Sequence, residues 1–302
     1  MESAIHTSAK LAPPSFDWRQ LLRDFYDLSK PGIGFYSLLT TAASFWLASA
    51  VFDPVRFIHT LIATALVTCG GGALNQVIEV EADSQMRRTE KRPLPSGRVS
   101  PQLGMLFGVV SSLAGTVYML FFVNGLASLL AIITLGGYLF IYTPLKKKTH
   151  FATLIGAFPG AVPILIGWAA VRGSLGMGAW ALFAILFLWQ IPHFLAIAWM
   201  YRKDYARAGF PLLTVIDPEG NRSALQILNY TLALVPVSLL PTLLHMTGAL
   251  YFSGALLLGL GFGIAAIRAA TGQRTNTRAR QLLFASIIYL PVLLALLAID
   301  KR

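Results

Sequence analysis

Residues 178–200 read GAWALFAILFLWQIPHFLAIAWM, a stretch of 23 residues without one charged side chain. An α-helix rises about 1.5 Å per residue, so about 20 apolar residues cross the roughly 30 Å of hydrocarbon in a bilayer. Charged residues follow it at once, at Arg202, Lys203 and Asp204. The stretch therefore predicts a helix that spans a membrane.

Eight further apolar runs extend this prediction to the whole chain. They lie near residues 33–52, 57–79, 103–123, 125–144, 152–171, 224–246, 248–268 and 281–299. The composition agrees, because 56% of the 302 residues are hydrophobic and 12% are charged, about half the charged share of soluble domains. With one cysteine, a disulfide scaffold is excluded as well. We expect an all-α polytopic membrane protein with a single domain over residues 1–302 and nine transmembrane helices over residues 33–299.

The Lys and Arg residues fall mainly on one side of these predicted helices. Of the 24, 20 lie in the N-terminal segment or in the loops after runs 57–79, 125–144, 178–200 and 248–268. The positive-inside rule makes that side cytoplasmic and places the C-terminus on the opposite side. Membrane topology thus accounts for the net charge of +11, and no nucleic acid is expected as a partner.

The N-terminal segment, residues 1–32, is expected to stay in the cytoplasm. It lacks the apolar core of a cleavable signal peptide. Residues 16–28 place six large apolar side chains among charges, which predicts a short amphipathic helix lying at the membrane surface. The expected location is a bacterial plasma membrane; a mitochondrial inner membrane is the less favoured alternative, because the segment is short and contains acids.

Oxygen-bearing side chains interrupt the end of run 57–79, in GGGALNQVIEVEADSQMRRTEKRPLPSGR (70–98). Asn75, Glu79 and Asp83 are spaced four apart and so share one helical face. They could simply mark the end of a helix. Burying ionisable groups near a membrane costs about 2–3 kcal/mol each, however, which favours a functional role. Amide and carboxylate oxygens with open positions suit Mg²⁺, so a magnesium site is expected.

Cations follow this row directly. Arginine matches phosphate oxygens bidentately, so Arg88 and Arg92 are candidate phosphate ligands, and the prolines at 93 and 95 would stiffen their loop. The positive-inside rule alone would also place cations here. For Lys146 and its two neighbours, 147 and 148, topology and phosphate binding are equally good explanations.

The second polar segment ends the run 178–200. Asp204 lies at the membrane boundary, and His193 lies eleven residues before it, three helical turns, on the same expected face. His193 could be a hydrogen-bonded packing residue or a ligand. Asp83 and Asp204 each end a helix at the cytoplasmic side, so the two helix ends could face each other across one central cavity. Mg²⁺ would then bridge a diphosphate between them.

An acidic mouth above an apolar cavity suits an isoprenyl diphosphate. Metal and cations would neutralise the charge on the departing pyrophosphate. The allylic carbon becomes cation-like, and the faces of Trp189, Phe194 or Trp199 could stabilise it, although Trp residues near a helix end can also form an aromatic belt. These features leave the acceptor open.

Several motifs resemble the UbiA-type intramembrane prenyltransferases. Residues 75–97 are similar to the first aspartate-rich motif of that family. A narrower resemblance, to the branch that farnesylates haem, is carried by NQ at 75–76, RT at 88–89, RPLP at 92–95, YTPLK at 142–146, WQIPHF at 189–194, DY at 204–205 and AGFP at 208–211.

The resemblance implies a UbiA-like helical bundle and transfer of a farnesyl group from farnesyl diphosphate to a vinyl group of haem B. Water adds to the resulting cation, giving haem O and pyrophosphate. It implies Mg²⁺ dependence, and a haem A synthase as a partner. Carried over to this chain, Asn75, Glu79, Asp83 and Asp204 hold Mg²⁺–diphosphate, Arg88, Arg92 and Lys146 bind phosphate oxygens, and His193 ligates or positions the haem.

Three departures and two alternatives accompany this resemblance. Lys30-Pro31 before run 33–52 fits the family, but Gly32 follows where a basic residue is expected. Glu79 stands where quinone-type relatives carry aspartate, and Met200 stands where their second motif has another aspartate, so the second metal site is thinner. One alternative is a prenyltransferase acting on a quinone precursor or another lipid; the histidine of WQIPHF argues against it. The other is a transporter or haem carrier, although the ionisable residues gather at one membrane face rather than at the midplane.

Overall fold

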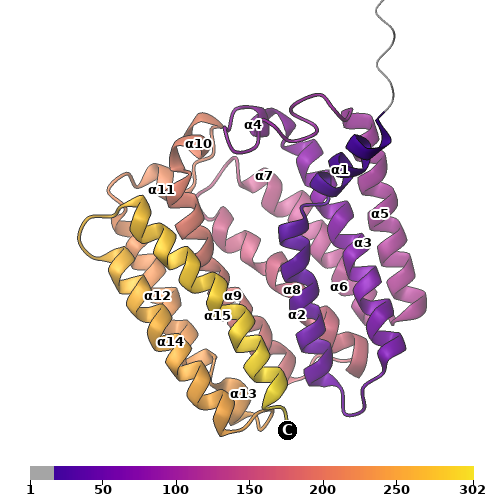
Figure 1. Ribbon diagram of the computed structural model, residues 1–302, viewed down its shortest axis with the longest axis vertical. Coiled ribbons are helices and arrows are strands. Elements are labelled where there is room, and N and C mark those ends of the chain that lie inside the picture. The colour runs from indigo at the N-terminus through magenta and orange to yellow at the C-terminus, as the bar shows by residue number, and fades with distance from the viewer. Residues whose placement is uncertain (1–16) are drawn as a thin grey trace, which may run out of the picture.

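The computed structural model describes residues 17–302, and within them every named element is a helix, which confirms the all-α prediction (Figure 1). In chain order the elements are α1 (Trp18–Leu28), α2 (Pro31–Ala48), α3 (Pro54–Ile78), α4 (Val80–Ser84), α5 (Pro101–Phe122), α6 (Gly125–Gly136), the π-helix η1 (Gly137–Tyr142), α7 (Thr143–Leu145), α8 (Ala152–Arg172), α9 (Met177–Met200), α10 (Arg202–Arg207), α11 (Leu213–Ile216), α12 (Asn221–Val237), α13 (Leu240–Leu243), α14 (Ala249–Ala270) and α15 (Asn276–Ile299).

Eight helical segments of residues 17–302 are long and apolar enough to cross a membrane, so this is an integral membrane protein. Two of them are composite: α6, η1 and α7 form one segment, and α12 and α13 form another. The remaining predicted run, 33–52, is α2, which has 18 residues and buries Thr40, Thr41 and Ser44. The expected count of nine is thus approximate, because α2 is not among these eight segments.

Capping residues set where the helices begin. Asp53 accepts a hydrogen bond from the Arg56 backbone N–H, and Pro54 occupies the first turn of α3. Ser100 and Thr275 cap α5 and α15 in the same way. Since side-chain oxygens satisfy the free N–H groups of a first turn, these helices start several residues before the apolar runs predicted at 57, 103 and 281.

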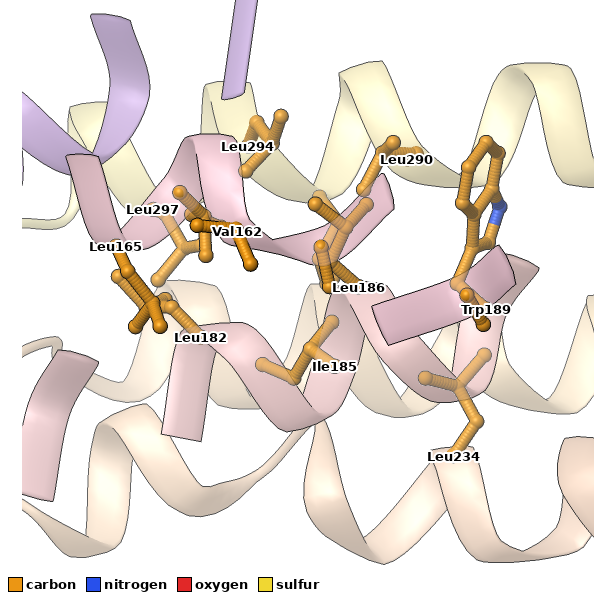
Figure 2. Packing of buried hydrophobic residues seen from close by; sticks show 14 of the residues in the cluster. Val162, Leu165, Leu182, Ile185, Leu186, Trp189, Leu234, Leu290, Leu294 and Leu297 are labelled. Carbon is orange, nitrogen blue, oxygen red and sulfur yellow. The ribbon is translucent and has the colours of Figure 1, made fainter. Parts of the chain in front are cut away.

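The buried core is centred on α8 and α9. In each of them 61% of the spanning window is buried, against 28% in α14. Figure 2 shows Val162 and Leu165 of α8 packed against Leu182 and Leu186 of α9, with Leu294 of α15 on the other side. This packing fixes the orientation of both central helices. It therefore also fixes the directions of the side chains near the end of α9.

In a membrane the hydrophobic effect does not drive helices together, because lipid tails are as apolar as leucine. Close packing between helices stabilises the bundle instead. The pair α3 and α5 shows this at Gly70, where an added Cβ would lie 2.6 Å from the carbonyl oxygen of Gly108. Only glycine fits at that crossing, and α3 is thereby fixed where it carries Asn75 into the bundle.

The helix predicted over 16–28 is present as α1, whereas residue 16 lies outside the described part of the chain. Asp17 caps it, and Trp18, Leu22 and Tyr26 form an exposed stripe at four-residue spacing. Leu28 and Asp24 face inward. That the exposed stripe lies in the membrane surface stays a prediction.

An ion pair between a buried carboxylate and a partly exposed guanidinium ties α1 to the loop before α5. The Arg98 Nε lies 2.9 Å from Oδ1 of Asp24, whose side chain is 3% exposed against 36% for Arg98. Replacing Arg98 with Met leaves a buried carboxylate with Gln20 as its remaining side-chain partner and is expected to cost about 3 kcal/mol of unfolding free energy. Asp24→Asn returns a half-exposed guanidinium to water and should cost about 1 kcal/mol. Thermal unfolding in detergent measures both, and an equal loss in the two variants would contradict this account.

Candidate active site

Asn75, Glu79 and Asp83 form a buried column, here called the oxygen row. Each is at most 3% exposed. The Glu79 N–H donates to the Asn75 carbonyl at 3.0 Å, and the Asp83 N–H donates to the Glu79 carbonyl at 2.8 Å, so the helical spacing continues. The helix is not continuous as predicted, because α3 ends at Ile78 and α4 begins at Val80. Glu81, on α4, points away and is exposed.

Each member of the oxygen row is bonded to a cation from a different part of the chain. The Lys30 ammonium donates to the side-chain oxygen of Asn75. The Lys146 ammonium lies 3.1 and 3.3 Å from the two carboxylate oxygens of Glu79. The Arg92 guanidinium lies 2.7 Å from Oδ2 of Asp83. Three cations and three oxygen-bearing side chains therefore meet at one end of the bundle.

Lys30 occupies a strained corner between α1 and α2. Its φ of 52° is left-handed, a conformation that costs a non-glycine residue about 1 kcal/mol or more. Burial lowers the pKa of its ammonium to about 7, against the opposing attraction of Glu79. Lys146 differs: burial alone would lower its pKa, but Tyr142 and Glu79 raise it above the usual value. The corner thus holds an amine that the sequence spacing did not assign to the site.

The π-helix η1 and the first residue of α7 bring two tyrosines and a threonine to the same place. The rings of Tyr138 and Tyr142 stack with centroids 5.6 Å apart, and the Tyr138 hydroxyl lies 3.4 Å from the Lys30 nitrogen. The Asn75 amide donates to the Thr143 hydroxyl at 2.8 Å, which fixes its oxygen toward Lys30. Short π segments often occur at functional sites, and this one ends a membrane-spanning segment beside the oxygen row.

The ends of α4 and α9 meet, as the sequence predicted. Figure 1 shows α4, α7 and α10 at the same end of the bundle. The Arg88 guanidinium donates to the Tyr205 hydroxyl at 3.2 Å and lies 5.0 Å from the ring centre of Tyr201. The Lys146 ammonium lies 4.4 Å from the ring centre of Phe210. Cations of one half thus rest on aromatic side chains of the other.

Asp204 is separate from the oxygen row. It forms an ion pair with Arg207, its neighbour on α10. Within residues 17–302 no group of three or more His, Cys, Asp and Glu side chains is close enough to hold a metal. The expected face shared by His193 and Asp204 is also not kept, since α9 ends at Met200 and a new helix starts at Arg202. The four expected metal ligands are therefore not assembled as one cluster.

The aromatic residues of α9 point in different directions. Trp189 and His193 are buried and stack, with ring centroids 4.8 Å apart. Phe194 is 39% exposed and meets His193 edge-on. Trp199 lines a separate pocket between α9, α12 and α15, beside Gly220. At about 100° per residue, position 199 lies roughly a third of a turn away from position 193, so a single aromatic-lined face was not to be expected.

The oxygen row fits a magnesium–diphosphate group. Its donor atoms are all oxygens, and the partners of Glu79 and Asp83 are cations of the kind that bind phosphate oxygens. Lys30 and Arg88 add two more positive groups at the same end. Sequence spacing identified this row and three of the cations, Arg88, Arg92 and Lys146. It did not assign Lys30 to the site, although the Lys30-Pro31 pair before a helix fits the family resemblance.

Known proteins are similar to this chain in sequence. A profile of the UbiA prenyltransferase family matches residues 37–288. A protoheme IX farnesyltransferase of Solibacter usitatus is 47% identical over 290 residues, covering 93% of this chain and 99% of that relative. A protein of the same name from Salinibacter ruber is 43% identical over 281 residues, covering 93% and 99%.

Solved structures show the same fold. The bundle is similar to a structure of digeranylgeranylglyceryl phosphate synthase, with a TM-score of 0.77, 18% identity and coverage of 93% of this chain and 98% of that one. It is also similar to a UbiA homologue from Archaeoglobus fulgidus bound to DMAPP and Mg²⁺, with a TM-score of 0.68, 12% identity and coverage of 91% and 99%. Since the family profile spans most of the sequence, the chain belongs to the UbiA prenyltransferase family.

Proposed function

We propose that this protein transfers the farnesyl group of farnesyl diphosphate to a vinyl group of haem B. The C–O bond to the diphosphate breaks, the allylic carbon bonds to the vinyl group, and water adds to the resulting cation with loss of a proton. The products are haem O and pyrophosphate. The observation that supports the donor is the oxygen row with its cations at one end of an apolar bundle. The names of the relatives support the acceptor.

Different residues of the chain are proposed to bind the metal and the phosphate oxygens. Glu79, Asp83 and Asn75 would hold the headgroup end through Mg²⁺, whereas Asp204 pairs with Arg207 and stands apart from them. Mg²⁺, when bound, neutralises charge that develops on the leaving pyrophosphate. Arg88, Arg92 and Lys146 supply fixed positive charge for the phosphate oxygens, and Lys30 supplies a further amine beside Asn75.

The apolar part of the donor would lie between the helices. Trp189 would stabilise the allylic cation through its ring face, and burial would keep bulk water from it, whereas Phe194 is 39% exposed and points another way. His193 is the proposed haem-binding residue. The separate location of Trp199 leaves it without a part in this step.

The proposed setting is a bacterial plasma membrane, with the oxygen row at the cytoplasmic face. The distribution of 20 of the 24 Lys and Arg residues supports this orientation, and the relatives come from bacteria. A haem A synthase is the proposed partner that receives the product.

The decisive experiment supplies purified protein with farnesyl diphosphate, Mg²⁺ and haem B. The expected result is a haem that has gained a farnesyl group and a hydroxyl group, together with released pyrophosphate, detected by mass spectrometry. Omitting Mg²⁺ or the diphosphate should stop both. If haem stays unchanged while an aromatic acid of the quinone pathway class is prenylated, the proposed acceptor is wrong. If substrate crosses vesicles without any diphosphate cleavage, the chain is a transporter.

A further inference from the structure

One residue of the last helix fixes His193 from two directions. The His193 Nδ1 lies 2.8 Å from Oγ of Ser286, on α15. The indole N–H of Trp189 donates to the backbone carbonyl of the same Ser286 at 2.9 Å. The Trp189 ring then stacks on the imidazole with an interplanar angle of 25°. All three residues are buried, so the imidazole ring has a defined direction.

The hydroxyl hydrogen of Ser286 is already used elsewhere. Its Oγ lies 2.6 Å from the backbone carbonyl oxygen of Leu283, one turn earlier, which is the distance of an O–H···O hydrogen bond. Two oxygens that close repel each other unless a hydrogen lies between them, so the hydroxyl donates to Leu283. A hydroxyl has one hydrogen, and only lone pairs remain to face His193. The proton of the neutral imidazole must therefore sit on Nδ1, which leaves Nε2 with a free lone pair.

We propose that Ser286 is a positioning residue that holds His193 in its Nδ1–H tautomer and presents Nε2 to the iron of the porphyrin acceptor. This rests on the proposed function, because it takes the acceptor to be an iron porphyrin. Histidines that bind metals usually donate their other ring N–H to a fixed acceptor. Within residues 17–302, Nε2 of His193 has no hydrogen-bond partner.

The depth of His193 in the bundle is consistent with this role. It lies seven residues before the end of α9, or about 10 Å along the helix from the end that carries the cations. Pro192 removes a backbone N–H just before it, which permits a local bend of the helix there. A planar acceptor held at Nε2 would thus lie deeper than the diphosphate headgroup.

The tautomer can be measured without any haem. In protein labelled with ¹⁵N at histidine, with His193→Gln used to assign the signal, we expect a protonated Nδ1 and an unprotonated Nε2. Ser286→Thr keeps the hydroxyl and should keep this pattern. Ser286→Ala retains the carbonyl that anchors Trp189 but loses the acceptor, so the single tautomer should be lost. A protonated Nε2 in the unmodified protein would overturn the inference.

The second experiment titrates haem into the variants. Loss of such an outer partner typically weakens metal binding by 10-fold or more, so we expect about tenfold weaker haem binding and a lowered iron–histidine stretching frequency in Ser286→Ala. Ser286→Thr should restore both, and diphosphate binding should stay unchanged. The matched control is Ser238→Ala, which also removes a buried hydroxyl, one that pairs with Tyr289 at 2.6 Å, and should bind haem normally.

The outcomes separate this inference from the proposed function. If the unmodified protein binds no haem and prenylates another acceptor, the proposed function has failed. If it binds haem and Ser286→Ala does so equally well with the same iron–histidine frequency, only the role of Ser286 has failed. An equal loss of haem affinity in Ser286→Ala and Ser238→Ala would also contradict it, because the loss would then come from general destabilisation of the bundle.

Discussion

Asp83→Asn is expected to lower kcat by a factor on the order of 10³ while the protein stays folded. Asp83 is 1% exposed and ends the oxygen row, and its carboxylate is held by Arg92 at 2.7 Å. Asparagine has the same shape and can still accept that hydrogen bond, so packing should be preserved. What it lacks is the negative charge that attracts a divalent ion to the headgroup. The measurement is the steady-state rate of pyrophosphate release at saturating farnesyl diphosphate.

Glu81→Gln is the matched control for this experiment. It changes a carboxylate to an amide on the same short helix, but Glu81 is exposed and lies off the row. Its activity should equal that of the unmodified protein. Raising Mg²⁺ should recover part of the lost rate in Asp83→Asn and leave Glu81→Gln unaffected. Full activity in Asp83→Asn, or a comparable loss in Glu81→Gln, would contradict the proposed role of the oxygen row in the reaction.

The row could be predicted from the sequence because helical periodicity is local. Asn75, Glu79 and Asp83 share a face whenever hydrogen bonds four residues apart continue, and those bonds survive the break at Glu79. Hydropathy likewise predicts spanning segments, since the length of a helix that crosses hydrocarbon is fixed by the bilayer. Neither prediction depends on which helices are neighbours in the fold.

The partners of the row depend on packing, which periodicity does not contain. Lys30 reaches Asn75 because of a left-handed corner at one residue, and no pattern in the sequence predicts that corner. Asp204 was expected to join the row, but the helix breaks after Met200 and the carboxylate pairs with Arg207 instead. Ser286 lies 93 residues from His193 in sequence, so only the packing of α9 on α15 brings the two together. Helix identity was therefore predictable, and side-chain pairing across helices was not.

Lys30→Gly is expected to reduce kcat/KM for farnesyl diphosphate on the order of 100-fold. Its free energy of unfolding should stay close to that of the unmodified protein. The activity should fall because the Lys30 amine beside Asn75 is one of the donors proposed to face the headgroup. The stability should hold because glycine adopts a φ of 52° without the strain that lysine bears, which offsets its greater freedom in the unfolded chain.

Lys30→Ala separates the effect of losing the amine from the effect of strain at the left-handed corner. It removes the same amine, so its activity should fall as far as that of Lys30→Gly, but alanine keeps the strain of the left-handed corner without the contacts of the lysine side chain. Its unfolding free energy should be about 1 kcal/mol below that of Lys30→Gly. Thermal unfolding and farnesyl diphosphate kinetics, measured on the same samples, test both statements. If activity followed stability across the two variants, Lys30 would serve only to hold the corner; if both lose activity equally while differing in stability, the amine itself acts on the diphosphate.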